Sequence, residues 1–134
     1  MNDMTNSSDF DWVSARERCS MTKAFVTLKA EVKRDVDARN KALGDRYPFR
    51  FDLTDNGDSF TVHTASEQQI DIKTVTFERE KNSLNVRGTD GKAKLVATLT
   101  INSSGECRFK VNGEECDSWY VRKLALEDLF FWNS

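Results

Sequence analysis

The single histidine of the chain, His63, and its three cysteines, Cys19, Cys107 and Cys116, are the residues best suited to nucleophilic catalysis. A thiol enzyme needs its cysteine and a base within hydrogen-bond reach of each other. His63 alternates with polar neighbours, whereas Cys107 shares the spacing of Phe109. Successive side chains of a strand point to opposite faces, so we expect His63 on a polar face and Cys107 on an apolar one. The sequence therefore predicts no Cys–His pair.

The acidic segment 52–58 superficially matches a calcium-binding loop. Such a loop has oxygen ligands at alternate positions, a bidentate Glu at position twelve and a helix on either side. Counted from Asp52, position twelve is His63, and the residues on both sides have the periodicity of strands. We therefore expect a hairpin turn in this segment and predict no metal ion.

Two pairs of carboxylates, Glu78 with Glu80 and Glu114 with Glu115, lie beside predicted turns. Acid–base catalysis needs such a pair in a pocket that shifts the pKa of one member, whereas charges beside turns are solvated. No segment matches the glycine-rich loop that binds phosphates. The sequence thus predicts a protein that is not an enzyme, with no catalytic residue and no cofactor.

Charge and hydropathy narrow the range of partners. The formal net charge is −2, so the basic balance that is typical of nucleic-acid binders is missing. No apolar run approaches the ~20 residues that a membrane span needs. We therefore expect neither a nucleic-acid partner nor insertion into a membrane.

The cysteines and the N-terminal residues predict a location. An odd number of cysteines without a Cys-x-x-Cys motif argues against a disulfide framework, and reduced thiols fit a reducing compartment. Residues 1–8 lack the basic and apolar regions of a signal peptide. We expect a cytoplasmic protein with a buried, unreactive Cys107.

A long amphipathic helix is predicted over residues 9–43, after a disordered leader at 1–8. This stretch has no Gly or Pro, Ser8 or Asp9 can cap its start, and Gly44 can end it. Apolar residues recur every three or four positions, as on a core-facing helix. The predicted core stripe consists of Phe10, Val13, Met21, Ala24, Phe25, Leu28, Val32, Val36 and Leu43.

A second apolar stripe lies on the opposite side of this helix and ends at Ala30. It needs a partner surface, which could be the C-terminal segment or a second copy of the chain. The helix would be about 50 Å long, whereas strands of six to eight residues reach only ~20–27 Å. It must either break near residues 20–22 or project past the sheet, and a projecting helix favours a homodimer. The predicted interface consists of Trp12, Ala15, Cys19, Val26 and Trp132.

Between residues 49 and 111 the apolar residues recur at every second position, in runs separated by turn-forming segments such as Asn112-Gly113. This pattern predicts an antiparallel β-meander of about six strands with one apolar face. In the third strand, Ile70 and Ile72 are out of phase with Val75 and Phe77. Either a β-bulge near residues 73–74 or two shorter strands would explain that mismatch.

The C-terminal segment 117–134 is apolar nearly all the way round a helix, so we expect it to be buried on more than one side. Asp117 or Ser118 can cap this short helix, although residues 119–123 could instead begin as a seventh strand. The sequence therefore predicts one α+β domain over residues 9–134. In it, the long N-terminal helix packs on the meander and the short C-terminal helix closes an edge.

The leading functional hypothesis is a non-catalytic interaction module that forms a homodimer or binds another protein. The alternative is a binder of a small apolar ligand, held in a cavity between the helix and the curved sheet. A tightly filled core would exclude that cavity. Its predicted lining is Phe49, Phe51, Phe60, Phe109 and Trp119.

Overall fold

The computed structural model describes residues 9–46, 49–66 and 72–132. It confirms the predicted α+β fold, with a long N-terminal helix, an antiparallel sheet and a short C-terminal helix. The helices are α2 (Trp12–Arg18), α3 (Met21–Leu43), the 3-10 helix η1 (Gly44–Arg46) and α4 (Ser118–Phe130). The strands are β1 (Phe49–Asp55), β2 (Ser59–Ser66), β3 (Thr74–Arg79), β4 (Leu84–Arg87), β5 (Ala93–Ile101), β6 (Cys107–Val111) and β7 (Glu114–Cys116).

The N-terminal helix is broken between α2 and α3, which confirms one of the two predicted alternatives. Ser20 has extended backbone, and its side chain accepts a hydrogen bond from the Lys23 N–H group at 3.2 Å. Ser20 therefore caps α3 as a separate helix. The cap of α2 is Asp11 and not Asp9, while Ser8 lies outside the described residues. Hydrogen bonds from the hydroxyl and the N–H group of Ser14 lower the pKa of the Asp11 carboxyl.

The strands form one seven-stranded antiparallel sheet in the order of the sequence. The strand beyond the predicted six is β7, which pairs with β6 across the Asn112-Gly113 turn. Both turn residues have positive φ, 53° and 82°, as a two-residue hairpin turn of this hand requires. Three residues were too few for β7 to be found by periodicity.

The bulge predicted at residues 73–74 is wrong. The strand β3 begins at Thr74, and Ile72 lies before it with 48% of its surface exposed. A register shift occurs instead between Val86 and Arg87, where β4 pairs with β5. Ile70 lies outside the described residues, so the alternative of two short strands is not addressed by the structure.

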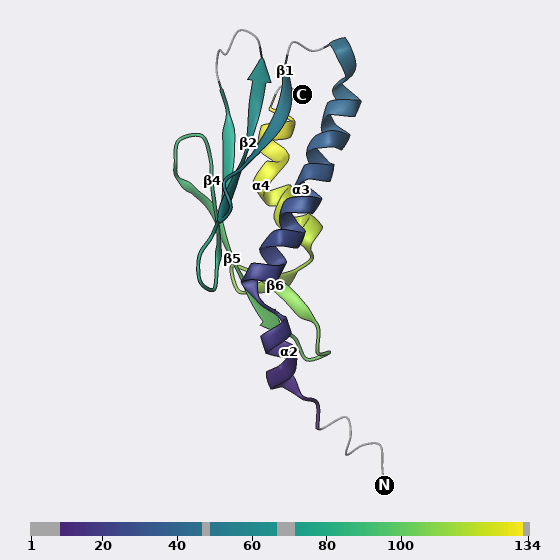
Figure 1. The fold of residues 1–134 in the computed structure, drawn as a ribbon, viewed down its shortest axis with the longest axis vertical. Helices are drawn as coiled ribbons and strands as arrows, with labels where there is room; N and C mark the ends of the chain where they lie inside the picture. Colours follow the sequence, from purple (N-terminus) through teal and green to yellow (C-terminus); the bar gives the residue numbers. More distant parts are fainter. Residues whose placement is uncertain (1–8, 47–48, 67–71, 133–134) are drawn as a thin grey trace.

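Helices α3 and α4 lie side by side on one face of the sheet and run in the same direction (Figure 1). The prediction that the C-terminal helix closes an edge was therefore wrong, because its apolar residues pack on the strands between the two edges. Helix α3 contacts β1 and β3, and α4 contacts β3, β5 and β6. Between the layers, the ring of Phe60 stacks on Phe77 at 4.6 Å and meets Phe25 at 5.2 Å. The core is therefore an aromatic-rich layer that the sheet and both helices share.

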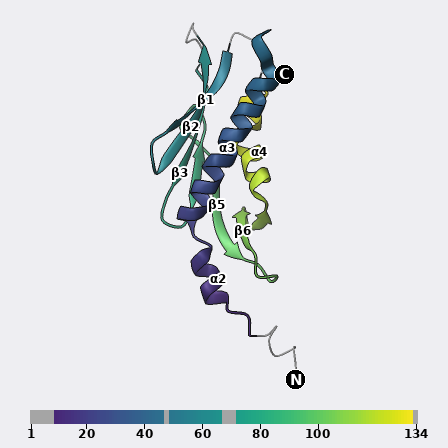
Figure 2. The ribbon, with the colours of Figure 1, turned by 45° about the vertical axis from the view of Figure 1, so that its right-hand side comes forward.

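The predicted core stripe of the N-terminal helix is correct for α3 but not for α2. Six of its residues, from Met21 to Leu43, are buried, and Ala24 is partly buried. Phe10 and Val13, in contrast, are 48% and 50% exposed. Helix α2 extends beyond the N-terminal end of α3, away from the rest of the helical layer (Figure 2). It contacts β5 there, and neither Phe10 nor Val13 is part of the core.

Candidate interaction surface

The outer stripe that was predicted as an interface is not one continuous surface. Trp12 and Val26 are 64% and 62% exposed, but Ala15 and Cys19 are buried, at 8% and 2%. Trp132 is 43% exposed, and its ring lies 5.6 Å from that of Phe49. Helix α2 and the C-terminal end of the chain lie at opposite ends of the molecule (Figure 1). The five residues therefore do not form a single contact patch.

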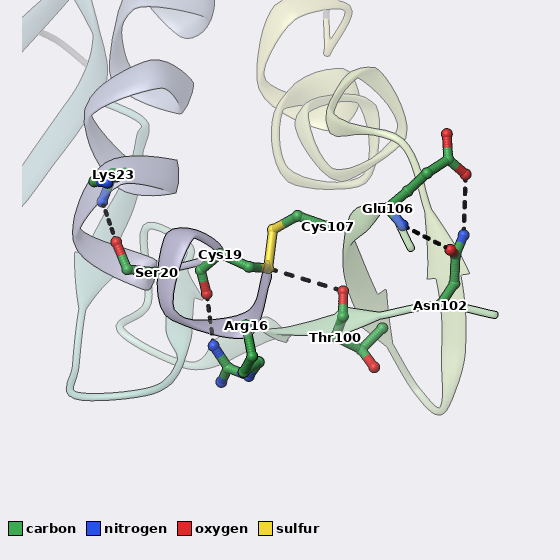
Figure 3. Close-up of a disulfide and its surroundings, with 8 residues drawn as sticks. All are labelled: Arg16, Cys19, Ser20, Lys23, Thr100, Asn102, Glu106 and Cys107. Carbon is green, nitrogen blue, oxygen red and sulfur yellow. Dashed lines mark hydrogen bonds between the residues drawn. A yellow bond between two sulfur atoms is a disulfide. The ribbon is translucent and has the colours of Figure 1, made fainter. Parts of the chain in front are cut away.

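Cys19 is covered because it forms a disulfide with Cys107, 88 residues further along the chain (Figure 3). The Cα atoms of the two cysteines are 5.4 Å apart, and the Cys19 Sγ atom lies 3.8 Å from the carbonyl oxygen of Thr100. The prediction of reduced thiols was wrong for this pair, since so large a separation leaves no local signal in the sequence. Cys107 is also exposed and not buried as predicted, because it lies at the start of β6. Cys116 has a free thiol, and burial raises its pKa.

The aromatic side chains predicted to line a ligand cavity do not surround one space. Phe51 and Phe60 are fully buried and Phe109 is 9% exposed, within the packed core. The ring of Phe51 lies 5.0 Å from that of Phe130 and 5.7 Å from that of Phe49. Trp119 is 55% exposed, on α4. The phenylalanine rings thus fill the layer between sheet and helices.

His63 lies on the polar face of β2, as predicted. Its Nε2 atom is 3.1 Å from the Thr54 Oγ1 atom, and its Nδ1 atom is 3.3 Å from the Thr64 carbonyl oxygen. Cys107 is in the disulfide, so the two residues form no catalytic pair. Within the described ranges, no group of three or more His, Cys, Asp or Glu side chains could hold a metal ion.

The acidic segment 55–58 is the turn between β1 and β2, as predicted. The Asp55 carboxylate accepts hydrogen bonds from Lys29 Nζ at 2.8 Å and from the Gly57 N–H group at 2.9 Å. These bonds, with that of Lys29 the stronger influence, lower the pKa of Asp55. The turn therefore anchors the β1–β2 hairpin to α3.

A groove of about 480 Å³ runs between α3 and α4. Its α3 wall contains two small, exposed residues, Ala38 and Ala42. Its α4 wall combines charged residues, among them Lys123 and Glu127, with large apolar side chains. The large apolar residues on α4 and just after it are Trp119, Leu126, Phe130 and Phe131. The small residues on the α3 side leave room for another chain segment.

Polar contacts hold the two helices at this spacing. The Arg122 Nη1 atom donates to both carboxylate oxygens of Asp35 at 2.8 Å, and the side chains are only 16% and 31% exposed. The Ser118 hydroxyl donates to the Glu31 carboxylate. Further along, Arg39 Nε donates to the Phe130 carbonyl oxygen at 2.8 Å. Because these contacts recur at three successive turns of α3, at Glu31, Asp35 and Arg39, the groove is formed within the single chain.

Four side chains form a ridge along the groove, spaced four residues apart: Trp119, Lys123, Glu127 and Phe131. Residues at this spacing lie on one face of a helix. We call them the α4 ridge. The two aromatic residues are 55% and 49% exposed. The side chains of Lys123 and Glu127, paired at 3.0 Å, are 46% and 53% exposed.

One end of the ridge is fixed by α3. The Arg39 guanidinium lies 4.1 Å from the centre of the Phe131 ring while its Nε atom binds the Phe130 carbonyl oxygen. At the other end, the Trp119 ring meets the Tyr120 ring edge-on at 5.5 Å. Each of the two exposed aromatic rings therefore has a neighbour within the chain.

Sequence reasoning named Trp119 but assigned it to an internal cavity, and it missed the rest of the ridge. Two features of the sequence indicated the ridge: the four-residue spacing of positions 119, 123, 127 and 131, and the apolar residues that occur nearly all the way round the C-terminal helix. They could not be interpreted without α3, because α3 determines which face of α4 is left open.

Comparison with protein-family models, curated proteins and solved structures yields no match to this chain, so no relative suggests a function. Among the described residues, no helix combines the length and the apolar character that crossing a membrane requires.

Proposed function

We propose that this protein is a non-catalytic interaction module that binds a polypeptide in the groove between α3 and α4. The observation that carries the proposal is the α4 ridge, in which two aromatic side chains are about half exposed beside a groove formed within the single chain. Exposed apolar patches of this kind mark interaction sites on soluble domains. Aromatic residues are also enriched at protein–protein interfaces.

The shape of the groove favours a polypeptide over a small molecule. It lies along two helices that run side by side, and the ridge covers twelve residues of helix, or about 18 Å. Grooves of this form accept an amphipathic helix, whose apolar residues enter at intervals of three and four positions. The charged pair Lys123 and Glu127 in the middle of the ridge would fix the register of such a helix.

The dimer interface predicted from the sequence, on the outer face of the N-terminal helix, has weaker support. Ala15 and Cys19 are covered within the chain, and Trp12 and Val26 lie on different helices. The cytoplasmic location was argued from reduced thiols and from the N-terminal residues, and the Cys19–Cys107 disulfide removes the first of these arguments. Neither is therefore part of the proposal.

Site-specific photocrosslinking in the native cells tests the proposal. A benzophenone amino acid in place of Trp119 would sit on the ridge, and one in place of Val96 would be a matched control on the opposite face of the sheet, where Val96 is 47% exposed. We expect discrete adducts with a polypeptide from position 119 and none from position 96. Absence of adducts at position 119, or equal labelling from both positions, would contradict the proposal.

A further inference from the structure

The chemical order of side chains along the α4 ridge is complementary to its own reverse. From Trp119 to Phe131 it reads aromatic, positive, negative, aromatic, and reversal exchanges only the signs of the two central charges. Trp119 and Phe131 each lie six residues from Ala125, and Lys123 and Glu127 each lie two residues from it. A surface with this order is complementary to a copy of itself that runs in the opposite direction.

From this order we infer that the groove is occupied by the α4 ridge of a second copy of the chain, in a two-fold symmetric dimer. The inference rests on the proposed function and names the partner. In a two-fold interface the same patch is used by both subunits, so each contact occurs twice. An axis passing between Lys123 and Glu127 sets each Lys123 against Glu127 of the other copy, and each Trp119 against the other Phe131.

The groove has the dimensions and contacts that such a ridge requires. Interlocking ridges of residues four apart are the commonest way in which helices pack. The low wall of Ala38 and Ala42 leaves space beside α4 for the incoming aromatic side chains. The Phe131 ring contacts the Arg39 guanidinium and is still 49% exposed, so part of it remains open to a partner ring.

The central charges carry the specificity. Within one chain, Lys123 and Glu127 are paired with each other at 3.0 Å and remain about half exposed. In the dimer, the Lys123 and Glu127 side chains of both copies lie around the two-fold axis with alternating signs. Each of these charges therefore also has an opposite charge from the other copy beside it. Reversing one charge places like charges together at two symmetric positions, and such contacts strongly oppose association.

Charge reversal tests the inference with purified full-length chain in sedimentation equilibrium. We expect the wild type to dimerise reversibly, and each single variant, Lys123→Glu or Glu127→Lys, to dimerise at least about tenfold more weakly. An equimolar mixture of the two single variants should form a heterodimer, because opposite charges then face each other across the axis. In that mixture each single variant still has two like charges at positions 123 and 127 of its own helix. A recovered dimer affinity therefore reports pairing between the chains and not a repaired charge pair within one helix.

The matched control is the pair Lys33→Glu and Asp37→Lys, which has the same spacing on the flank of α3 that faces β1. These variants should dimerise as the wild type does. Circular dichroism of every variant verifies its fold.

Three results would overturn the inference: a strictly monomeric wild type, single variants as dimeric as the wild type, or a mixture without heterodimer. If the wild type is monomeric but position 119 still crosslinks to a different polypeptide, the inferred dimer is contradicted and the proposed function is not. If the wild type is monomeric and position 119 gives no adducts, both the inferred dimer and the proposed function are contradicted.

Discussion

At the edge of the sheet, the side chain of Asn40 occupies the place of a neighbouring strand. Its amide Nδ2 donates to the Phe51 carbonyl oxygen at 2.8 Å, and its Oδ1 atom accepts from the Phe51 N–H group at 2.9 Å. Among the described strands, β1 is the first in the sheet order, so none of them lies along its outer edge. Unpaired edges invite association with other chains. Asn40 therefore protects β1 and ties it to α3.

We expect Asn40→Ala to lower the free energy of unfolding by about 1–3 kcal/mol, because it leaves two partly buried backbone groups without their partner. Urea denaturation followed by fluorescence measures the change. The control is Asn82→Ala in the exposed β3–β4 turn, for which we expect a change within about 0.5 kcal/mol. Equal effects of the two substitutions would show that the Asn40 contact does not stabilise the protein.

At the scale of elements, α2 depends on the disulfide more than on packing. It has only seven residues, and isolated helices of that length are not stable in water. Besides Cys19, Ala15 is its buried side chain. The ring of Phe10, just before it, lies against Gly105, where an added Cβ would come within 2.8 Å of the ring. Helix α3, in contrast, has its own cap at Ser20 and its own core stripe.

The double variant Cys19→Ser/Cys107→Ser should therefore lose α2 while α3 remains folded. We expect a loss of about 2–5 kcal/mol in the free energy of unfolding, since the disulfide closes a long loop of the unfolded chain. Amide hydrogen exchange should be fast over α2 and unchanged over α3. The control is Cys116→Ala, which removes a thiol that has no disulfide partner.

A titration of thiols tests the disulfide itself. Unfolded, unreduced wild-type protein should show one reactive thiol, that of Cys116, because the other two cysteines are bonded to each other. Three reactive thiols would contradict the Cys19–Cys107 disulfide and would support the reduced cysteines that the sequence predicted.

The sequence predicts those elements whose signals are local. Gly44, with its positive φ, ends α3 as predicted, and alternation of apolar residues marks the strands from β1 to β6. The start of α3 at Ser20 was predicted only as one of two alternatives, a break near residues 20–22. The Cys19–Cys107 bond and the short strand β7 are different, because they arise from contacts between distant or very short segments. The groove also arises from distant segments, because all seven strands lie between its two helices in the sequence. It therefore could not be predicted from a local signal.

At the scale of the whole molecule, the sheet uses one face for the core, and the helical layer covers that face and presents the groove outward. The polar contacts between α3 and α4 keep the groove open in the single chain. Such a preformed surface reduces the entropy lost on binding. The ridge contact is short, however, and small interfaces are usually weak. We therefore expect a dimer that dissociates on dilution.

Amide chemical shifts recorded over a dilution series test the location of this interface most directly. Dilution of the wild type should shift amides of α4 between Trp119 and Phe131 and of the α3 wall at Ala38 and Ala42. The amides of Trp12 and Val26, on the outer side of the N-terminal helices, should stay constant. Shifts centred on Trp12 and Val26, or a spectrum that does not change with concentration, would contradict the account.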